Sequence, residues 1–321
     1  MLHIALRGNK TYMWKFILKR LATIIPILIG ATFIVFFIMY LAPSDATAMI
    51  APDASDAERE ELRDELGLND PFLVQYGRFL FNLVRGDLGT SFKSGSPVME
   101  ELLQRIPYTI ALAFAASTIT ILVAIPLGMF AAIKQNSFFD SISMAFCLIG
   151  VSMPAFWVGL LLMLLFSVKL GWMPVSGADT FKHIILPAMT QSVAGMAAIG
   201  RVTRSSMLEV IRQDYIRTAR SKGIFERTVI VHHAMKNAML PTVTAAGLQI
   251  GNLLCGGVIT ETVFSWPGVG RYLVTSISWR DTPCVLGCVV FFVVGISIVN
   301  LTVDILYGFI DPRIKAIYKK A

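Results

Sequence analysis

The sequence predicts an all-α integral membrane protein with six transmembrane helices and an external loop domain between helices 1 and 2. The chain is 55% hydrophobic and only 15% charged, whereas soluble domains carry roughly 25% charged residues. Uncharged runs long enough to cross a bilayer recur along it. They cover residues 21–42, 106–133, 141–168, 183–200, 237–260 and 282–303. Basic residues flank some of these runs and orient the predicted bundle.

The N-terminal arm, residues 1–20, is basic and is therefore expected on the cytoplasmic side. Residues 21–42 form the first predicted transmembrane helix. This run exceeds the roughly 7 to 15 apolar residues of a secretory signal, so we interpret it as an uncleaved anchor. An even number of spans puts the basic tail, residues 311–321, on the cytoplasmic side as well.

The first long loop, residues 43–105, is predicted to be an external loop domain because it holds twelve acidic and only six basic residues. Ser55 and Glu58 have the spacing of a capping box, which predicts a charged helix running to Leu66. An amphipathic helix is predicted over residues 72–84. The pattern fits a docking platform for an external protein, a lid over a pore or a folded spacer.

The transmembrane core is predicted over residues 106–310, and it contains few polar side chains. Such residues tend to face a cavity or another helix. The candidates for a translocation path are Ser152, Met153, Pro154, Gln249, Asn252 and Asn300. Pro154 predicts a break or kink in the third helix. Hydrogen bonding between helices is the alternative role for the polar candidates. Glu261 and Asp304 are placed at span ends.

The loop 201–236 within this core carries eight basic and three acidic residues, which predicts a cytoplasmic location. Met207, Ile211, Tyr215 and Ala219 recur every fourth residue and are predicted to line one helical face. Gly223 then ends the pattern, as expected for a left-handed helix cap.

The stretch DYIRTARSKG, from Asp214 to Gly223, resembles the EAA loop of ABC-importer permeases, which docks a short helix into a cleft of a cytoplasmic ATPase. Residues 14–313 also carry, in order, ELGLNDPFLVQY, GDLGTSF, GVSMPAFW, HAMKNAMLP and ETVFSWPGVGRYLV, and are similar to the first-permease, B-type subunits of the dipeptide, oligopeptide and nickel branch. The resemblance implies a type I importer permease fold. It also implies these ATPase-coupling residues: Asp214, Tyr215, Arg217, Thr218, Ala219, Arg220, Lys222 and Gly223.

The resemblance further implies that the chain forms half of a pore for peptides delivered by a solute-binding protein, with import of nickel, metallophores or glutathione as alternatives. The implied partners are a second homologous permease chain, two cytoplasmic ATPases, the external binding protein and membrane lipid. The implied location is the bacterial cytoplasmic (inner) membrane.

No catalytic role is expected, because the sequence lacks a phosphate-binding Gly-x4-Gly-Lys-Ser/Thr motif and other catalytic signatures. ATP and magnesium are therefore expected on the partner ATPase, and no cofactor in this chain. No metal site is expected, since Cys284 and Cys288 lack a convergent ligand. No nucleic-acid partner is expected either, because the basic residues flank membrane spans. An ion-coupled secondary transporter is the alternative from another class.

Overall fold

A computed structural model describes residues 2–42, 46–51 and 53–310. In this part, helices are the only regular secondary structure apart from one isolated bridge between Thr90 and Pro97. The predicted tail 311–321 and small parts of the external loop lie outside these residues. The elements follow in the order α1 (Leu2–Leu41), α2 (Ala46–Ile50), α3 (Asp56–Glu65), α4 (Phe72–Val84), α5 (Val98–Ile133), α6 (Phe138–Ser152), α7 (Ala155–Leu162), the π-helix η1 (Met163–Lys169), α8 (Lys182–Ile211), α9 (Asp214–Ser221), α10 (Glu226–Thr228), the π-helix η2 (Val229–Ala234), α11 (Met235–Val263), α12 (Val269–Ser278) and α13 (Thr282–Ile310).

Five helices in the described part are long and apolar enough to cross a membrane, and a sixth span results if the bent pair formed by α6 and by α7 with η1 counts as one. The predicted number of six is reached only with this pair. The two halves meet at 109°, so the third span is not the single helix that its uncharged run suggested. Met153 has an extended backbone with ψ of 132° and precedes Pro154, which lacks the N–H that would continue the helix. The predicted break at Pro154 is confirmed.

The external loop folds largely as its local signals predicted. The Ser55 side chain accepts a hydrogen bond from the backbone of Glu58, and the Glu58 carboxylate accepts one from the backbone of Ser55, which completes the capping box of α3. These bonds hold the pKa of Glu58 below its ordinary value. The second helix, α4, has the predicted bounds. Gly67 adopts a φ of +63° in the turn that joins the two helices.

The helix α8 lies at the centre of the bundle, against α5, α6 and α11. A methyl group on Gly128 of α5 would overlap the carbonyl oxygen of Gly200 on α8, so the absence of a side chain permits this close crossing. Arg204 of α8 also pairs with Asp140 at the start of α6 through two bonds of 2.6 and 2.7 Å. Backbone contact and ion pair together fix α8 against its neighbours.

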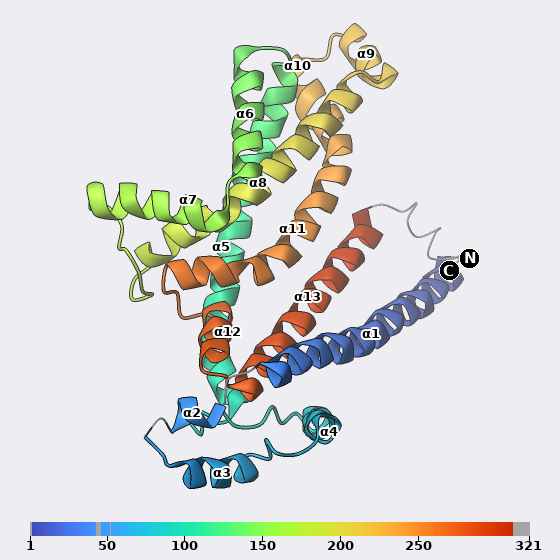
Figure 1. Ribbon diagram of the computed structural model, residues 1–321. Helices are drawn as coiled ribbons and strands as arrows, with labels where there is room; N and C mark the ends of the chain where they lie inside the picture. The colour runs from blue at the N-terminus through green and yellow to red at the C-terminus, as the bar shows by residue number, and fades with distance from the viewer. Residues whose placement is uncertain (1, 43–45, 52, 311–321) are drawn as a thin grey trace.

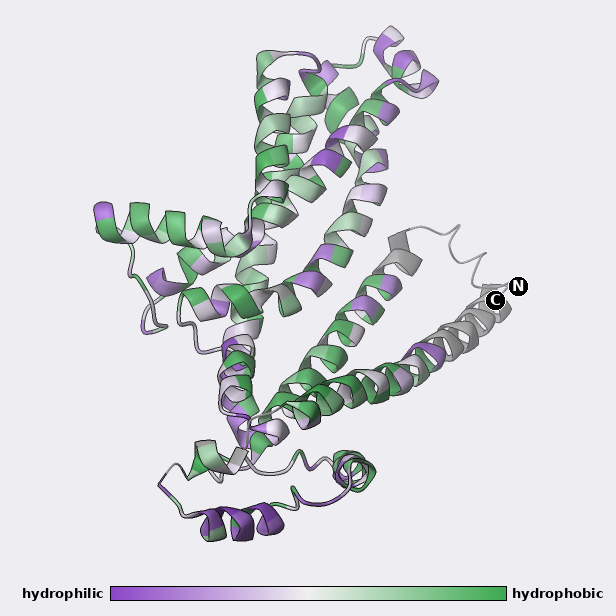
Figure 2. Ribbon diagram, viewed as in Figure 1, coloured by the Kyte–Doolittle hydropathy of each residue, from purple (hydrophilic) through white to green (hydrophobic). Residues whose placement is uncertain are grey.

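Figure 1 shows that α9 and α10 lie at one end of the molecule and that α2, α3 and α4 lie at the other. In Figure 2 the hydrophilic colour concentrates on α3 and α9, while the long helices between them are mainly hydrophobic. The two charged loops are therefore separated by the length of the apolar helices, which is the arrangement expected if they lie on opposite sides of a membrane.

Candidate functional site: the loop helix α9, the polar core and an external pocket

The short helix α9 forms because the chain breaks and restarts after α8. Gln213 is extended, with ψ of 149°, and so separates α8 from α9. Asp214 occupies the first turn of α9 and Arg220 the last, where each charge complements the helix dipole. Gly223 follows with a φ of +74°, as the sequence predicted. A side chain there would meet no atom within 4 Å, so the backbone conformation alone requires glycine.

The inner face of α9 packs into an apolar cluster that we call the α9 socket. Ile216 is buried and Ala219 is only 8% exposed. The buried residues of the socket are Ala132, Met207, Ile216, Ala219, Val229, Ile230, Ala234 and Ala238, from the ends of α5 and α8, from α9, from η2 and from the start of α11. The socket therefore joins α9 to residues of α5, α8 and α11 in one apolar cluster.

The prediction that Met207, Ile211, Tyr215 and Ala219 line one helical face is wrong. Tyr215 is 43% exposed, whereas Met207 and Ala219 are buried. The break between α8 and α9 changes the helical phase, so a spacing of four counted across it no longer selects one face. Ala219 supports α9 from within the protein, and Tyr215 is available to a partner.

The outer face of α9 is polar and carries the remaining predicted residues. Asp214, Arg217, Thr218 and Lys222 are all exposed. Arg220 donates two hydrogen bonds, of 3.1 and 2.7 Å, to the Glu226 carboxylate across the turn at Gly223. This pairing raises the pKa of Arg220, so its guanidinium remains charged.

Two aromatic side chains stand out on this surface, and sequence reasoning missed one of them. Phe225 is 85% exposed, just past the turn at Gly223. Tyr215 is held by a 2.9 Å hydrogen bond from Asn237 to its hydroxyl. Exposed aromatic groups among charges are typical anchors of protein interfaces. The signal for Phe225 was an aromatic residue between a capping glycine and the charged start of the next helix.

The first group of path candidates lies at the bend between α6 and α7. Ser152 and Pro154 are exposed and Met153 is half-buried. The Ser152 hydroxyl donates to the carbonyl of Leu148 at 2.9 Å, within its own helix. The bend thus presents a polar, interrupted stretch of backbone beside α8.

The second group lies on α11 and α13. Gln249 packs against Gly195 of α8, where an added methyl group would come 3.0 Å from its Nε2. Asn300 packs against Gly251 in the same way at 3.1 Å, and Asn252 is exposed. These contacts match the close helix packing expected at such glycines and join Gln249 and Asn300 to neighbouring helices.

Sequence reasoning also missed Gln191 in α8. It is buried and its Nε2 donates to the backbone carbonyl of Leu253 on α11. Its position within the fourth uncharged run was the available signal.

Glu261 is a buried carboxylate that ties three elements together. Thr109 of α5 donates to Glu261 Oε1 at 2.8 Å, and the backbone N–H of Arg271 in α12 donates to Oε2 at 3.0 Å. A methyl group on Gly268 would overlap the carboxylate. The segment ETVFSWPGVG therefore forms a turn in which Gly268 packs against the carboxylate of Glu261, the first residue of the segment.

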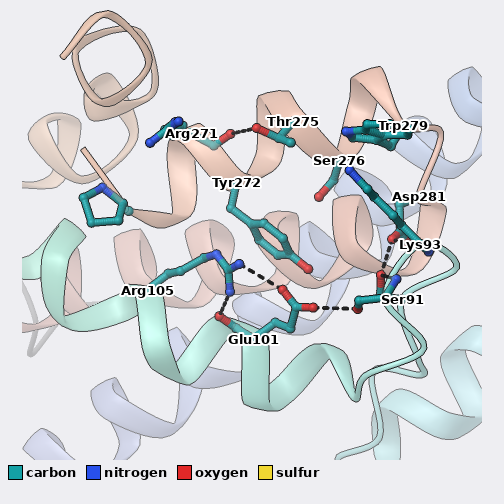
Figure 3. Close-up of a pocket in the computed structure, with 13 residues that line it drawn as sticks. Ser91, Lys93, Glu101, Arg105, Arg271, Tyr272, Thr275, Ser276, Trp279 and Asp281 are labelled. Carbon is teal, nitrogen blue, oxygen red and sulfur yellow. Dashed lines mark hydrogen bonds and ion pairs between the residues drawn. The ribbon is translucent and has the colours of Figure 1, made fainter. Parts of the chain in front are cut away.

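A pocket of about 410 Å³ opens between the external loop, the start of α5 and α12 (Figure 3). Buried Asp281 accepts hydrogen bonds from the Ser91 hydroxyl and from the backbone of Phe92 at 3.2 Å, which clamps the loop to the turn before α13. The Lys93 ammonium lies 3.2 Å above the Trp279 ring. The external loop is thus fixed to the transmembrane core.

Among the described residues, no group of three or more His, Cys, Asp and Glu side chains is arranged to hold a metal ion. Cys284 and Cys288 are buried, and the Tyr272 hydroxyl donates to the Cys284 sulfur at 2.8 Å.

Two family models match the chain. Residues 124–316 match the binding-protein-dependent transport system inner membrane component, and residues 13–113 match the N-terminal part of such a membrane component. The dipeptide transport system permease proteins DppB of Alkalihalophilus pseudofirmus and of Escherichia coli are each 41% identical to 94% of this chain, which covers 100% and 99% of them. The glutathione transport system permease protein GsiC of Salmonella paratyphi A is also 41% identical, over 94% of this chain and 99% of its own length.

Solved structures share the fold at low sequence identity. Two inward-facing crystal forms of the MetNI methionine ABC transporter match 66% of this chain and 97% of theirs, with TM-scores of 0.55 and 0.56 at 16% and 17% identity.

Proposed function

The chain belongs to the family of inner-membrane components of binding-protein-dependent transport systems and is an ABC-importer permease of the dipeptide and oligopeptide branch; we propose that it forms half of a translocation pore for peptides that a solute-binding protein delivers. The dipeptide permeases among its relatives support peptides as the cargo. A glutathione permease of equal identity makes glutathione the second candidate, and a nickel or metallophore complex remains a third.

Coupling to ATP hydrolysis is assigned to α9. The observation that carries this assignment is the division of the helix into a buried apolar face and an exposed face with Tyr215, Arg217 and the Arg220–Glu226 pair. When a cytoplasmic ATPase bound to the exposed face changes conformation, it moves the α9 socket, and α5, α8 and α11 move with the socket. ATP and magnesium then bind to two partner ATPases and not to this non-catalytic chain.

The assembly requires a second, homologous permease chain to complete the pore. Both termini and residues 201–236 lie in the cytoplasm under this proposal, and residues 43–105 face the outside of the bacterial inner membrane. The opposite placement of α3 and α9 in the bundle supports this orientation.

The arrangement of carboxylates favours an ATP-driven importer over ion-coupled transport. Glu261 is bound by Thr109 and by the backbone of Arg271, and Asp304 of α13 pairs with Arg20 of α1 at 2.7 Å. Both groups join helices at span ends, whereas a coupling carboxylate is expected near the bilayer centre and facing a cavity.

The experiment introduces a negative charge at Tyr215 on the exposed face of α9, or at Phe225 just past the turn that follows α9. Tyr215→Asp and Phe225→Asp should leave the permease folded, because both side chains are exposed, yet reduce co-purification of the ATPase and peptide transport in vesicles. Glu61→Lys on α3, at the other end of the molecule, is the matched charge-changing control for ATPase co-purification. Normal ATPase binding by both aspartate variants would contradict the proposal.

Cargo identity is tested separately, by calorimetry of the cognate soluble binding protein with dipeptides, longer peptides, glutathione and a nickel complex. Tight binding of peptides alone supports the proposed cargo. Tight binding of glutathione alone assigns the chain to the second candidate and leaves the role of α9 unaffected.

A further inference from the structure

The external helix α4 uses one of its faces to pack on α1. Tyr76 is buried there, and its hydroxyl donates to the carbonyl of Ile29 at 2.9 Å. Phe72 stacks edge-on against Phe33 and Phe37 with ring centroids 5.5 and 5.7 Å apart. These contacts fix α4 against the external half of α1.

A second apolar face of α4 has no contact with the described part of the chain that would cover it. Leu73 is 72% exposed, Phe81 57% and Val84 89%. In a helix with 100° per residue these three positions fall within a sector of about 80°, beside the buried face. Such a large exposed apolar face on a structured helix indicates an interaction surface.

The polar residues of α4 occupy the opposite edge. Gln75, Arg78 and Asn82 line a cavity of about 640 Å³ together with residues of the α3 to α4 turn, and Arg78 pairs with Asp70. Arg85 lies 4.0 Å above the Phe81 ring, at the border between the two faces. The helix therefore has a polar side toward the external loop and an apolar side away from it.

The exposed apolar face of α4 lies beside an exposed apolar surface of α1. Figure 1 shows α4 end-on while α1 runs across the picture, so α4 crosses α1, and their contacts at Ile29, Phe33 and Phe37 lie in the external half of α1. The neighbouring residues Ile38 and Leu41 of α1 are also exposed, at the end of a span that is little buried in the bundle. The apolar surface of α4 thus continues the apolar surface of α1.

We propose that α4 lies in the interface of the external leaflet, with Leu73, Phe81 and Val84 in contact with lipid acyl chains and with its polar edge in water. An amphipathic helix held parallel to the membrane buries its apolar face at the boundary between headgroups and acyl chains. The Tyr40 and Tyr76 rings that pack against Phe72 then lie at the depth where Tyr and Trp are enriched. In this position α4 anchors the external loop at a fixed height above the bilayer.

The test uses the assembled importer in lipid nanodiscs, with nitroxide labels on single cysteines. Leu73→Cys and Val84→Cys report the proposed lipid face, and Glu61→Cys on the exposed side of α3 is the control. The background replaces the native cysteines Cys147, Cys255, Cys284 and Cys288 by alanine. Relative accessibility to oxygen, which dissolves in lipid, and to a water-soluble nickel chelate is measured with and without the binding protein.

The proposal predicts that the two α4 labels collide more often with oxygen than with the chelate, and that the α3 label does the reverse. Chelate accessibility at all three positions would overturn it. Protection of the α4 labels only when the binding protein is present would assign the face to that protein, and protection from both reagents would assign it to another permease chain.

A second measurement keeps the native cysteines. Phe81→Trp in the otherwise unchanged chain should add fluorescence that lipids brominated on their acyl chains quench, relative to the parent protein. Glu61→Trp should add fluorescence that these lipids leave intact. Equal quenching of the two added signals would also overturn the proposal.

Discussion

Gly223 sets the direction in which the chain leaves α9, and its replacement isolates the contribution of backbone conformation to coupling. Its φ of +74° lies in the left-handed region, and a side chain at this position would meet no atom within 4 Å. Substitutions therefore change the conformational energy of one residue without adding a steric clash. The series Gly223→Asn, Gly223→Ala and Gly223→Val uses this property.

The magnitude follows from the left-handed penalty. An L-residue with a Cβ costs about 1–2 kcal/mol in this conformation. Asparagine tolerates it best, and a branched Cβ makes valine the least compatible of the three. Since 1.4 kcal/mol corresponds to about a tenfold change in an equilibrium, alanine should reduce the population of the native turn about tenfold relative to its alternatives, valine more and asparagine less.

The assay compares ATP hydrolysis with peptide transport in vesicles containing the complete importer. Because the α9 socket keeps α9 attached to the permease, ATP hydrolysis should persist in all three variants. Transport per ATP should fall least in the asparagine variant, more in the alanine variant and most in the valine variant. An asparagine variant as defective as the valine variant would refute the conformational argument and point to a steric requirement. Wild-type transport by all three would refute the role of the turn.

Three further predictions test other contacts. Ala219→Glu places an unpaired charge in the α9 socket at a cost of several kcal/mol, so the permease should lose the bound ATPase in co-purification, whereas exposed Arg212→Ala should retain it. Deletion of residues 55–65 should leave membrane insertion intact but reduce stimulation of ATP hydrolysis by the loaded binding protein, and unchanged stimulation would make this helix a spacer. Gly268→Ala should lower the thermal unfolding temperature because the methyl group overlaps the Glu261 carboxylate, and the loss in Gly268→Ala with Glu261→Ala should be smaller than the sum of the single losses, in contrast to independent sites.

Local signals in the sequence were sufficient where the structure depends on neighbouring residues. The capping box of Ser55 and Glu58, the bounds of α4 and the positive φ of Gly223 each depend on a few adjacent positions. The break at Pro154 was also predictable, because proline removes a backbone donor wherever it occurs.

The angle at that break and the orientation of α9 were not predictable in the same way. The 109° bend between α6 and α7 depends on packing of α7 against other elements. A methyl group on Gly159 would come 3.2 Å from Thr190 of α8 and 3.1 Å from Phe264 at the end of α11. The burial of Ala219 depends on the extended residue Gln213, which carries no sequence signal strong enough to reset the helical phase. Tertiary contacts decided both features.

The polar core was only partly predictable for a similar reason. Sequence alone identifies Gln249 and Asn300 as unusual in a membrane helix, but their partners lie on other helices, at Gly195 and Gly251. Whether a polar side chain faces a pore or a neighbouring helix depends on this pairing. For the same reason the role of Gln191 could not be predicted, because the carbonyl that accepts its hydrogen bond belongs to Leu253, which is distant in the sequence.

The coupling role of α9 is tested most directly by cross-linking between Phe225, just past the turn that follows α9, and the ATPase in the assembled importer. A single cysteine at Phe225, treated with a short thiol-to-amine reagent in inside-out vesicles, should give a product that contains the ATPase, while a cysteine at Glu61 should give none. Failure of that cross-link in an importer that still hydrolyses ATP, or labelling of the same cysteine from outside intact cells, would contradict the assignment of α9 as the coupling helix.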